Sequence, residues 1–215
     1  MGTRGRLCLA AATVFLGVSL AAHADVDPAG LMLHLDASNP ASYPGTGTVW
    51  YDLSPSANNA TLGAAVTFSN TVVGGELHWD GTIASLTTLA SLVNNYPPDK
   101  GSIQAWVRCD PNTYQSIISG NNTGWHQLTR HNGGQGLFYT TRNTNKSAGS
   151  SLETNNTLFP LGVWHHAVAT WDTTADPDIT ECKLWIDGVQ VRQSSTMYKP
   201  GPGSPANTQL GYIGG

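Results

Sequence analysis

Short runs of alternating hydrophobic and polar residues fill most of the chain, and glycine, proline or asparagine separates each run from the next. A period of two places successive side chains on opposite faces of a strand, whereas a helix needs apolar residues three or four positions apart. The pattern therefore predicts a series of strands and almost no helix. These strands cover residues 30–36, 60–69, 76–80, 102–109, 114–120, 125–131, 136–142, 163–172, 181–187 and 189–194.

Two short turns indicate how neighbouring strands pair. The segment NGGQG at 132–136 and the Asp187-Gly188 pair both supply residues that tolerate positive φ, which hairpin turns require. Many short strands joined in this way favour two packed antiparallel sheets. We therefore expect an all-β protein in which two sheets form one sandwich, with no internal repeat or domain linker.

The segment GVWHHAVATWD at 162–172 places two histidines side by side, which suggests a metal site or a catalytic base. Successive residues of a strand point to opposite faces, so His165 and His166 cannot bind one metal ion together. We expect one of the two rings to lie near the core with a backbone or hydroxyl partner. A role for one of them in binding is the alternative.

Composition and charge exclude some classes of function. Charged residues make up only 11% of the 215 residues, and the formal net charge is −4 with no basic run. Binding to nucleic acid requires clustered lysine and arginine opposite the phosphates, so we expect no nucleic-acid partner. No apolar segment after the first residues is long enough to cross a membrane.

The first 24 residues are typical of a secretory signal peptide. Arg4 and Arg6 precede a short apolar run, and Ala22 and Ala24 supply the small residues of a cleavage site. We expect a mature chain of residues 25–215 that is secreted or displayed at the cell surface. An N-terminal membrane anchor is the alternative.

Several motifs together resemble a known family. The segments SIQAWVR, VWHHAVATWD and CKLWIDGVQV, preceded by GLMLHLDASNPASY, VWYDLSPSANNATL and ELHWDG, are similar to LamG-like, concanavalin A-like domains of secreted bacterial proteins. The resemblance covers residues 29–215 and implies an antiparallel jelly-roll sandwich. It also implies that the chain stops at LGYIGG before the family's final strand, as a fragment of a longer protein would. The alternative is a short variant whose edge is covered by another segment.

Some domains of this fold hydrolyse polysaccharides with paired carboxylates. This chain has only Glu76, Glu153 and Glu181, and none has a second carboxylate at the required spacing. The aspartates of DTTADPD at 172–178 lie in a turn that contains proline, and no Gly-x-Ser-x-Gly motif is present. We therefore expect no enzymatic activity, with a polysaccharide hydrolase as the less favoured alternative.

The resemblance raises two further questions, of calcium and of a disulfide. Members of this fold often hold one calcium ion with loop oxygens, and Asp52 and Asn58 are the candidate ligands here, with ordinary turn residues as the alternative. The family arrangement pairs 102–109 with 163–171 and then 181–187. It separates Cys109 from Cys182 by roughly 20 Å at ~3.3 Å per residue, which exceeds the span of a disulfide, so we expect two free cysteines, with a disulfide as the alternative.

Sugar binding needs exposed aromatic rings beside polar side chains. The mid-chain hairpin offers such a set, namely Trp125, His126, Arg130, Tyr139 and Arg142, although ordinary half-buried packing is the alternative. Trp106 and Trp164 are expected in the core. The sequence thus predicts a secreted, non-catalytic module for recognition or adhesion that binds a glycan. A structural or protein-interaction domain of a larger surface protein is the alternative.

Overall fold

The computed structural model describes residues 29–71, 74–79, 87–88, 99–109, 115–121, 126–130, 135–142, 149–173, 179–198 and 209–213. In these residues there is no helix, and every strand pairing is antiparallel. The predicted signal peptide and Trp125 lie outside the described residues.

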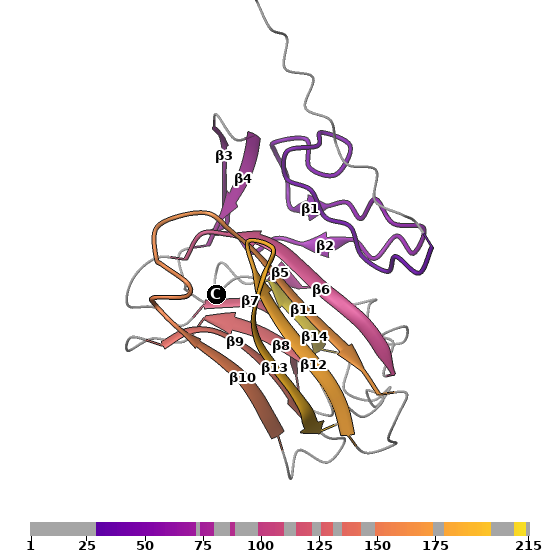
Figure 1. Ribbon diagram of the computed structural model, residues 1–215. Helices are drawn as coiled ribbons and strands as arrows, with labels where there is room; N and C mark the ends of the chain where they lie inside the picture. Colours follow the sequence, from indigo (N-terminus) through magenta and orange to yellow (C-terminus); the bar gives the residue numbers. More distant parts are fainter. Residues whose placement is uncertain are drawn as a thin grey trace, which may run out of the picture.

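Two sheets and one hairpin make up the described architecture (Figure 1). The larger sheet has the order β1 (Val49–Trp50), β2 (Ala60–Thr61), β5 (Thr87–Thr88), β14 (Gln209–Ile213), β7 (Gln115–Asn121), β8 (His126–Arg130), β9 (Gln135–Arg142) and β10 (Gly149–Asn155). The smaller sheet has the order β13 (Val189–Tyr198), β12 (Ile179–Ile186), β11 (His165–Asp172) and β6 (Lys100–Val107). The separate hairpin consists of β3 (Thr67–Thr71) and β4 (Gly74–His78).

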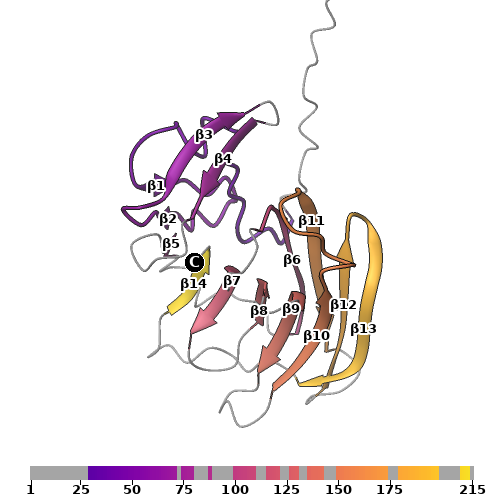
Figure 2. The same ribbon diagram turned by 90° about the vertical axis from the view of Figure 1, so that its left-hand side faces the viewer.

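The main core lies between the two sheets, which Figure 2 shows as two layers. Alternation along β11 sends Ala167, Ala169 and Trp171 inward, where they meet residues of the larger sheet such as Leu128. Gly101 on β6 is required opposite the indole, because a Cβ there would lie 2.4 Å from a ring carbon of Trp171. The two small alanines and this glycine leave room for one large ring inside the sandwich.

The N-terminal lobe (residues 29–71 and 74–79) has a hydrophobic cluster of its own, which includes Tyr43, Trp50 and Leu77. Figures 1 and 2 both place β1 to β4 of this lobe at one end of the sandwich. The Arg108 guanidinium lies 3.6 Å from a Glu76 carboxylate oxygen and so joins the sandwich to the β3–β4 hairpin.

Most of the predicted strands are present, but the first is not. Residues 31–36 form no ladder, because their backbone bonds to other groups: the His34 N–H donates to the Asp52 carboxylate at 2.7 Å, and the Asp36 N–H donates to the Ser42 hydroxyl at 3.0 Å. The predicted strand 60–69 is divided between β2 and β3, and β10 was not predicted. The prediction of an all-β antiparallel sandwich is confirmed.

The strand register also answers the question of the cysteines. Val107 pairs with His165, and Trp171 pairs with Cys182, so the two cysteines lie toward opposite ends of β11 as expected. Both are buried, and they are not joined to each other by a disulfide. Burial in the core, with a smaller contribution from the neighbouring Glu181 carboxylate, raises the pKa of the Cys182 thiol to about 12.

Candidate functional site

The two adjacent histidines lie on opposite faces of the smaller sheet, as the strand period requires. His165 is buried and His166 is partly exposed. The His165 ring is held at both nitrogens, because Nδ1 lies 2.7 Å from Asp187 Oδ2 and Nε2 lies 2.9 Å from the Pro160 carbonyl oxygen. Each ring nitrogen therefore has a polar partner within hydrogen-bond distance. His165 is therefore a structural residue with a backbone partner, as the sequence predicted.

Asp187 ties this region together from the β12–β13 turn. One carboxylate oxygen faces the His165 ring, and the other accepts the His166 N–H at 2.9 Å. Desolvation by itself would raise the pKa of Asp187, but the hydrogen bonds from His165 and His166 outweigh it and hold that pKa below its ordinary value. Asp187 and Gly188 adopt positive φ angles of 51° and 79°, which confirms the predicted hairpin turn.

The outward face of the smaller sheet, called here the tryptophan face, is the candidate site. Paired residues of neighbouring strands project to the same side, so the register defines this face. Across β6, β11, β12 and β13 it carries Lys100, Ser102, Gln104, Trp106, His166, Val168, Thr170, Asp172, Glu181, Lys183, Trp185, Gln190 and Gln193. Sugars, flat rings and extended polar chains are the ligands that such a mixture of aromatic and amide groups can hold.

Trp106 is the most exposed large hydrophobic side chain among the described residues, at 68%. Its indole lies against the His166 imidazole, with 5.1 Å between ring centroids and 23° between planes. Because β6 is the edge strand of this sheet, nothing in the described sheet covers the indole from the other side. The expectation that Trp106 and Trp164 lie in the core is wrong for Trp106, and neither ring belongs to the two buried clusters.

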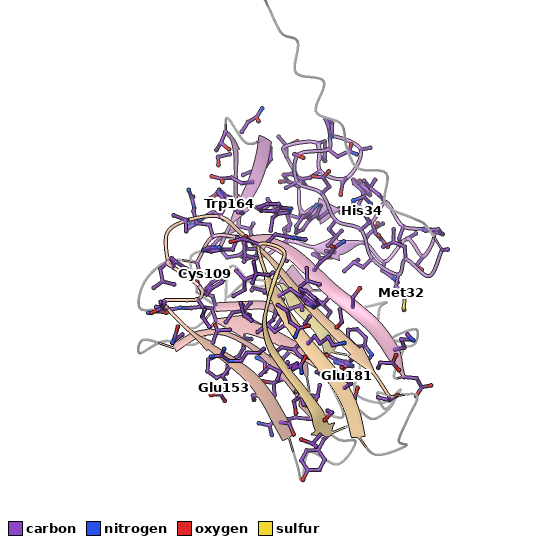
Figure 3. The ribbon with its side chains drawn as sticks, viewed as in Figure 1. Met32, His34, Cys109, Glu153, Trp164 and Glu181 are labelled. Carbon is purple, nitrogen blue, oxygen red and sulfur yellow. The ribbon has the colours of Figure 1, made fainter. Side chains whose placement is uncertain are left out.

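Trp164 continues the tryptophan face toward the N-terminal lobe. It is partly exposed, and the Arg108 guanidinium carbon lies 5.5 Å from the centroid of its ring. Figure 3 places the labelled Trp164 at the end of the sandwich that bears β3 and β4. At this end of the face the Arg108 guanidinium therefore contacts both the Trp164 ring and the Glu76 carboxylate of the N-terminal lobe.

Charges on the tryptophan face occur in pairs. Lys100 lies 2.8 Å from Asp172, and Lys183 lies 3.0 Å from Glu181, measured between the ammonium nitrogen and a carboxylate oxygen. Both pairs lie toward the end of the strands that is remote from Trp106. The middle of the face is left with amide, hydroxyl and aromatic groups and has no uncompensated charge among its described residues.

A bulge in β13 aligns two glutamines beside Trp185. The register shifts between Leu184 and Trp185, so Gln190 pairs with Trp185 while Gln193 pairs with Lys183. Residues three apart in a regular strand point to opposite faces, but the extra residue brings both glutamines to the same side. The Gln190 amide donates to the Gln193 amide oxygen at 2.7 Å, which fixes the two side chains against each other.

The hairpin predicted to bind sugar occupies a different environment. His126 and Tyr139 come together, but they do so inside the sandwich: their side chains are hydrogen-bonded, and their exposures are 2% and 0%. His126 also lies over Trp171, with 4.0 Å between ring centroids. Burial lowers the pKa of His126 to about 3.

The two arginines of that predicted set differ from each other. Arg130 is 1% exposed and lies on the inward side of β8 opposite Leu137, whereas Arg142 is exposed at the end of β9. A ligand on the surface could therefore reach Arg142 but not His126, Arg130 or Tyr139 as they stand. The hairpin's role in binding stays a prediction that depends on Trp125 and Arg142.

The residues predicted to hold calcium fit a different role. Each oxygen of the Asp52 carboxylate accepts two hydrogen bonds: Oδ1 from the N–H groups of His34 and Ser54, and Oδ2 from the Ser54 hydroxyl and the Asn58 N–H. The Asn58 amide donates to the Met32 carbonyl at 2.7 Å. A calcium ion needs oxygen lone pairs that these donors already occupy, so the loop as folded does not fit the ion. Among the described residues, no group of three or more His, Cys, Asp or Glu side chains could hold a metal.

The three glutamates lie on different elements, which bears on hydrolysis. Figure 3 shows Glu153 on β10 and Glu181 on β12, and Glu76 lies on β4. A retaining or inverting hydrolase needs two carboxyl groups facing each other across the scissile bond. The three glutamates are not paired with one another, whereas Asp172 lies directly opposite Glu181 across β11 and β12, and each of these two carboxylates is bound to a lysine. In the same part of the chain, no helix is long and apolar enough to span a bilayer.

The chain belongs to the concanavalin A-like lectin/glucanases superfamily, because a sequence model of that family (Laminin_G_3) matches residues 80–215, more than half of the chain. The match confirms the resemblance inferred from the motifs. It begins after the N-terminal lobe, so that lobe lies outside the matched segment. No curated protein matches the chain.

Two solved structures show a similar fold. The binding domain of Paraclostridial Mosquitocidal Protein 1 is 13% identical, with a TM-score of 0.55, and the match covers 79% of this chain and 46% of that one. The binding domain of botulinum neurotoxin DC, in complex with SialylT, is 14% identical with a TM-score of 0.56, covering 85% and 43%. The chain spans less than half of either neighbour, and at these identities the likeness establishes the fold alone.

The alternation of residues around Trp106 indicates that its side chain faces outward. In SIQAWVR, the alternate residues Ile103, Ala105 and Val107 form the more apolar set, and they pack against the core. The other set, Gln104 and Trp106, must then face outward. Comparing the two alternate sets of each strand, in place of ranking single residues by hydrophobicity, would have placed Trp106 on the surface.

Proposed function

We propose that this protein is an exported, non-catalytic binding module that holds carbohydrate on the tryptophan face. The observation that carries the proposal is the exposed Trp106 indole, which lies against His166 and has Gln104 two residues away on the same face of β6. Sugars place their C–H faces on aromatic rings and their hydroxyl groups on polar side chains. Burial does not account for the presence of a tryptophan at this position, because a ring that is so exposed buries little apolar surface and adds little to the stability of the fold.

Three further findings support this function. The superfamily to which the chain belongs is named after lectins as well as glucanases. One structural neighbour is a binding domain solved with SialylT, which is consistent with binding on a related sandwich. The predicted signal peptide at residues 1–24 would bring the module to the outside of the cell, where glycans are abundant.

A binding panel tests the proposal directly. The purified chain is melted, with tryptophan fluorescence as the signal, in the presence of soluble polysaccharides of different composition. A ligand at a hundred times its Kd adds about 2.7 kcal/mol to stability, which is several degrees in the melting temperature. Trp106→Ala should remove the shift, while Tyr51→Ala, which changes an exposed aromatic residue of the N-terminal lobe, should keep it.

Failure across the panel would favour the alternative function. If no polysaccharide raises the melting temperature of the wild-type chain, the carbohydrate proposal is wrong and a structural or protein-interaction domain accounts better for the exposed face. If a polysaccharide binds and Trp106→Ala binds it equally well, the module binds carbohydrate but the tryptophan face is not the site.

A further inference from the structure

We propose that the ligand of the tryptophan face is an uncharged glycan chain that runs diagonally across the sheet from Trp106 to Trp185. This inference rests on the proposed function and adds the class of glycan and its direction. Its basis is the placement of charges, aromatic rings and amides on β6, β11, β12 and β13.

The charges of the face are balanced locally, which disfavours an anionic ligand. Every described cation on it or at its end has a carboxylate within 3.6 Å: Lys100 with Asp172, Lys183 with Glu181, and Arg108 with Glu76. A sugar carboxylate or sulfate placed here would meet as many carboxylates as cations. Recognition of anions in proteins relies instead on donors that have no competing anion beside them.

The two aromatic anchors lie on different strands at a fixed offset. Trp106 on β6 pairs with His166 on β11, and Trp185 on β12 pairs with Val168, two residues further along β11. Two strand spacings of ~4.8 Å and two residues of ~3.3 Å separate their Cα atoms by roughly 12 Å. That distance exceeds one sugar ring, so both indoles can be covered only by a chain of linked sugars.

Amide groups accompany both anchors along this diagonal. Gln104 lies on β6 two residues from Trp106 and in the same cross-strand row as Val168 and Trp185, and the bonded Gln190–Gln193 pair lies beyond Trp185. With one amide proton of Gln190 committed to Gln193, the remaining donors and acceptors of the pair are held in place for a ligand. Amides offer both a donor and an acceptor, which suits sugar hydroxyl groups, since each hydroxyl is itself a donor and an acceptor.

The anchors differ in how they can take a sugar. His166 covers the face of Trp106 that points toward β11, so the open face lies on the outer side of the edge strand, and a chain stacked there passes over the Trp106–His166 stack to reach Trp185, which is only partly exposed on the inner strand β12. We therefore assign the main stacking contact to Trp106 and a secondary contact to Trp185. Loss of Trp106 should weaken binding about tenfold or more, as the loss of an interface aromatic anchor commonly does.

Affinity electrophoresis of the purified chain tests the class of glycan. The neutral probes are galactomannan, dextran and mixed-linkage β-glucan, and the anionic probes are alginate, heparin and polysialic acid. The runs are made at about pH 8, where ordinary histidines are neutral, and repeated at about 0.1 and 1 M salt. We expect retardation by at least one neutral probe that does not change with salt and that falls about tenfold or more in Trp106→Ala. Oligosaccharides of the same sugar should bind more tightly with length until both indoles are spanned, and no further.

A designed gain of function sharpens the test. The double substitution Asp172→Asn with Glu181→Gln leaves Lys100 and Lys183 without their carboxylates. It should create salt-sensitive binding to alginate or heparin that the wild-type chain lacks, while binding to the neutral probe remains. Trp106→Phe, which keeps a ring, should retain more affinity than Trp106→Ala.

The outcomes separate this inference from the proposed function. Salt-sensitive binding of the wild-type chain to an anionic probe alone, lost in Trp106→Ala, would overturn the neutral class and leave carbohydrate binding on this face intact. Affinity that is independent of oligosaccharide length would overturn the diagonal chain. No binding of any probe would overturn both proposals.

Discussion

Among the contacts between an aromatic ring and a histidine in the described residues, two form a contrast, because one lies inside the sandwich and the other faces the solvent. His126 and Tyr139 are stacked between the sheets, with 5.7 Å between centroids, while Trp106 and His166 are stacked outside the smaller sheet at 5.1 Å. Both pairs join an imidazole to a larger aromatic ring, and the two spacings are similar. The comparison teaches that an aromatic residue beside a polar one is evidence for binding only where the strand leaves it uncovered.

The difference has a simple origin in the two strands. β8 lies inside the larger sheet with β7 and β9 as neighbours, and all five of its residues are buried. β6 is the edge strand of the smaller sheet, and its alternate residues are exposed. Core packing therefore stabilises the interior stack, whereas the exterior stack is accessible to a ligand. The following predictions test this contrast.

The largest effect should come from the inward tryptophan of β11. Trp171→Ala removes a nearly buried ring that contacts His126 and packs against Gly101, so we expect a loss of about 3–5 kcal/mol in the free energy of unfolding. Trp106→Ala changes the same residue type on the neighbouring strand and should alter stability by no more than ~0.5 kcal/mol. Urea denaturation of both variants measures the difference, and similar losses would show that Trp106 is not exposed.

The interior histidine should make stability depend on pH. The folded-state pKa of His126 is about 3 and the unfolded value is 6.5, so the unfolded chain binds the proton first and stability falls as pH falls through this window. Between pH 7 and pH 5 this group should cost about 2 kcal/mol. His126→Phe keeps a ring and should be less sensitive to pH by that amount. Denaturation of both proteins at the two pH values gives the comparison, and equal slopes would mean that the ring is hydrated.

A smaller effect is expected at the turn that supports the exterior stack. Asp187→Asn retains a residue that tolerates positive φ but loses one acceptor for the His165 ring or the His166 amide, at a cost of about 1 kcal/mol. Because the folded-state pKa of Asp187 is lowered, its contribution exists above the unfolded value of 3.8 and disappears as pH falls through the folded value. The variant should lack this acid-dependent part in denaturation curves.

The control for Asp187 lies on the same sheet. Glu181→Gln removes a carboxylate that forms an ion pair with the partly exposed Lys183 ammonium, and such surface pairs contribute little. We expect a change within ~0.5 kcal/mol. If the two substitutions cost the same, the hydrogen bonds of Asp187 do not stabilise the turn.

The sequence was most informative where alternation was strong. In VWHHAVATWD the two alternate sets differ clearly, so the opposite directions of His165 and His166 could be predicted from the residues themselves. The pairing of β11 with β6 and β12, and with it the separation of the cysteines, was predicted from the family resemblance. The Asp187-Gly188 turn was equally clear, because few residue pairs adopt two positive φ angles.

It was least informative where the burial of a strand depends on the rest of the fold. In WHQLTRH neither alternate set is plainly apolar, and both are buried because β8 is central in its sheet, a fact set by distant strands. The bulge that aligns Gln190 with Gln193 follows from register and leaves no mark in composition. The Asp52 loop resembles a calcium loop, because oxygen-rich turns and oxygen ligands use the same residues.

Oxidative footprinting of the tryptophans, with and without a bound polysaccharide, tests the central claim most directly. Mass spectrometry of the digested chain reports how fast each indole is modified, and Trp171 serves as the buried reference. The account predicts that Trp106 is oxidised far faster than Trp171 in the free chain and is protected by the ligand. Protection of the peptide that contains Trp125, with Trp106 unaffected, would contradict it and return the site to the hairpin.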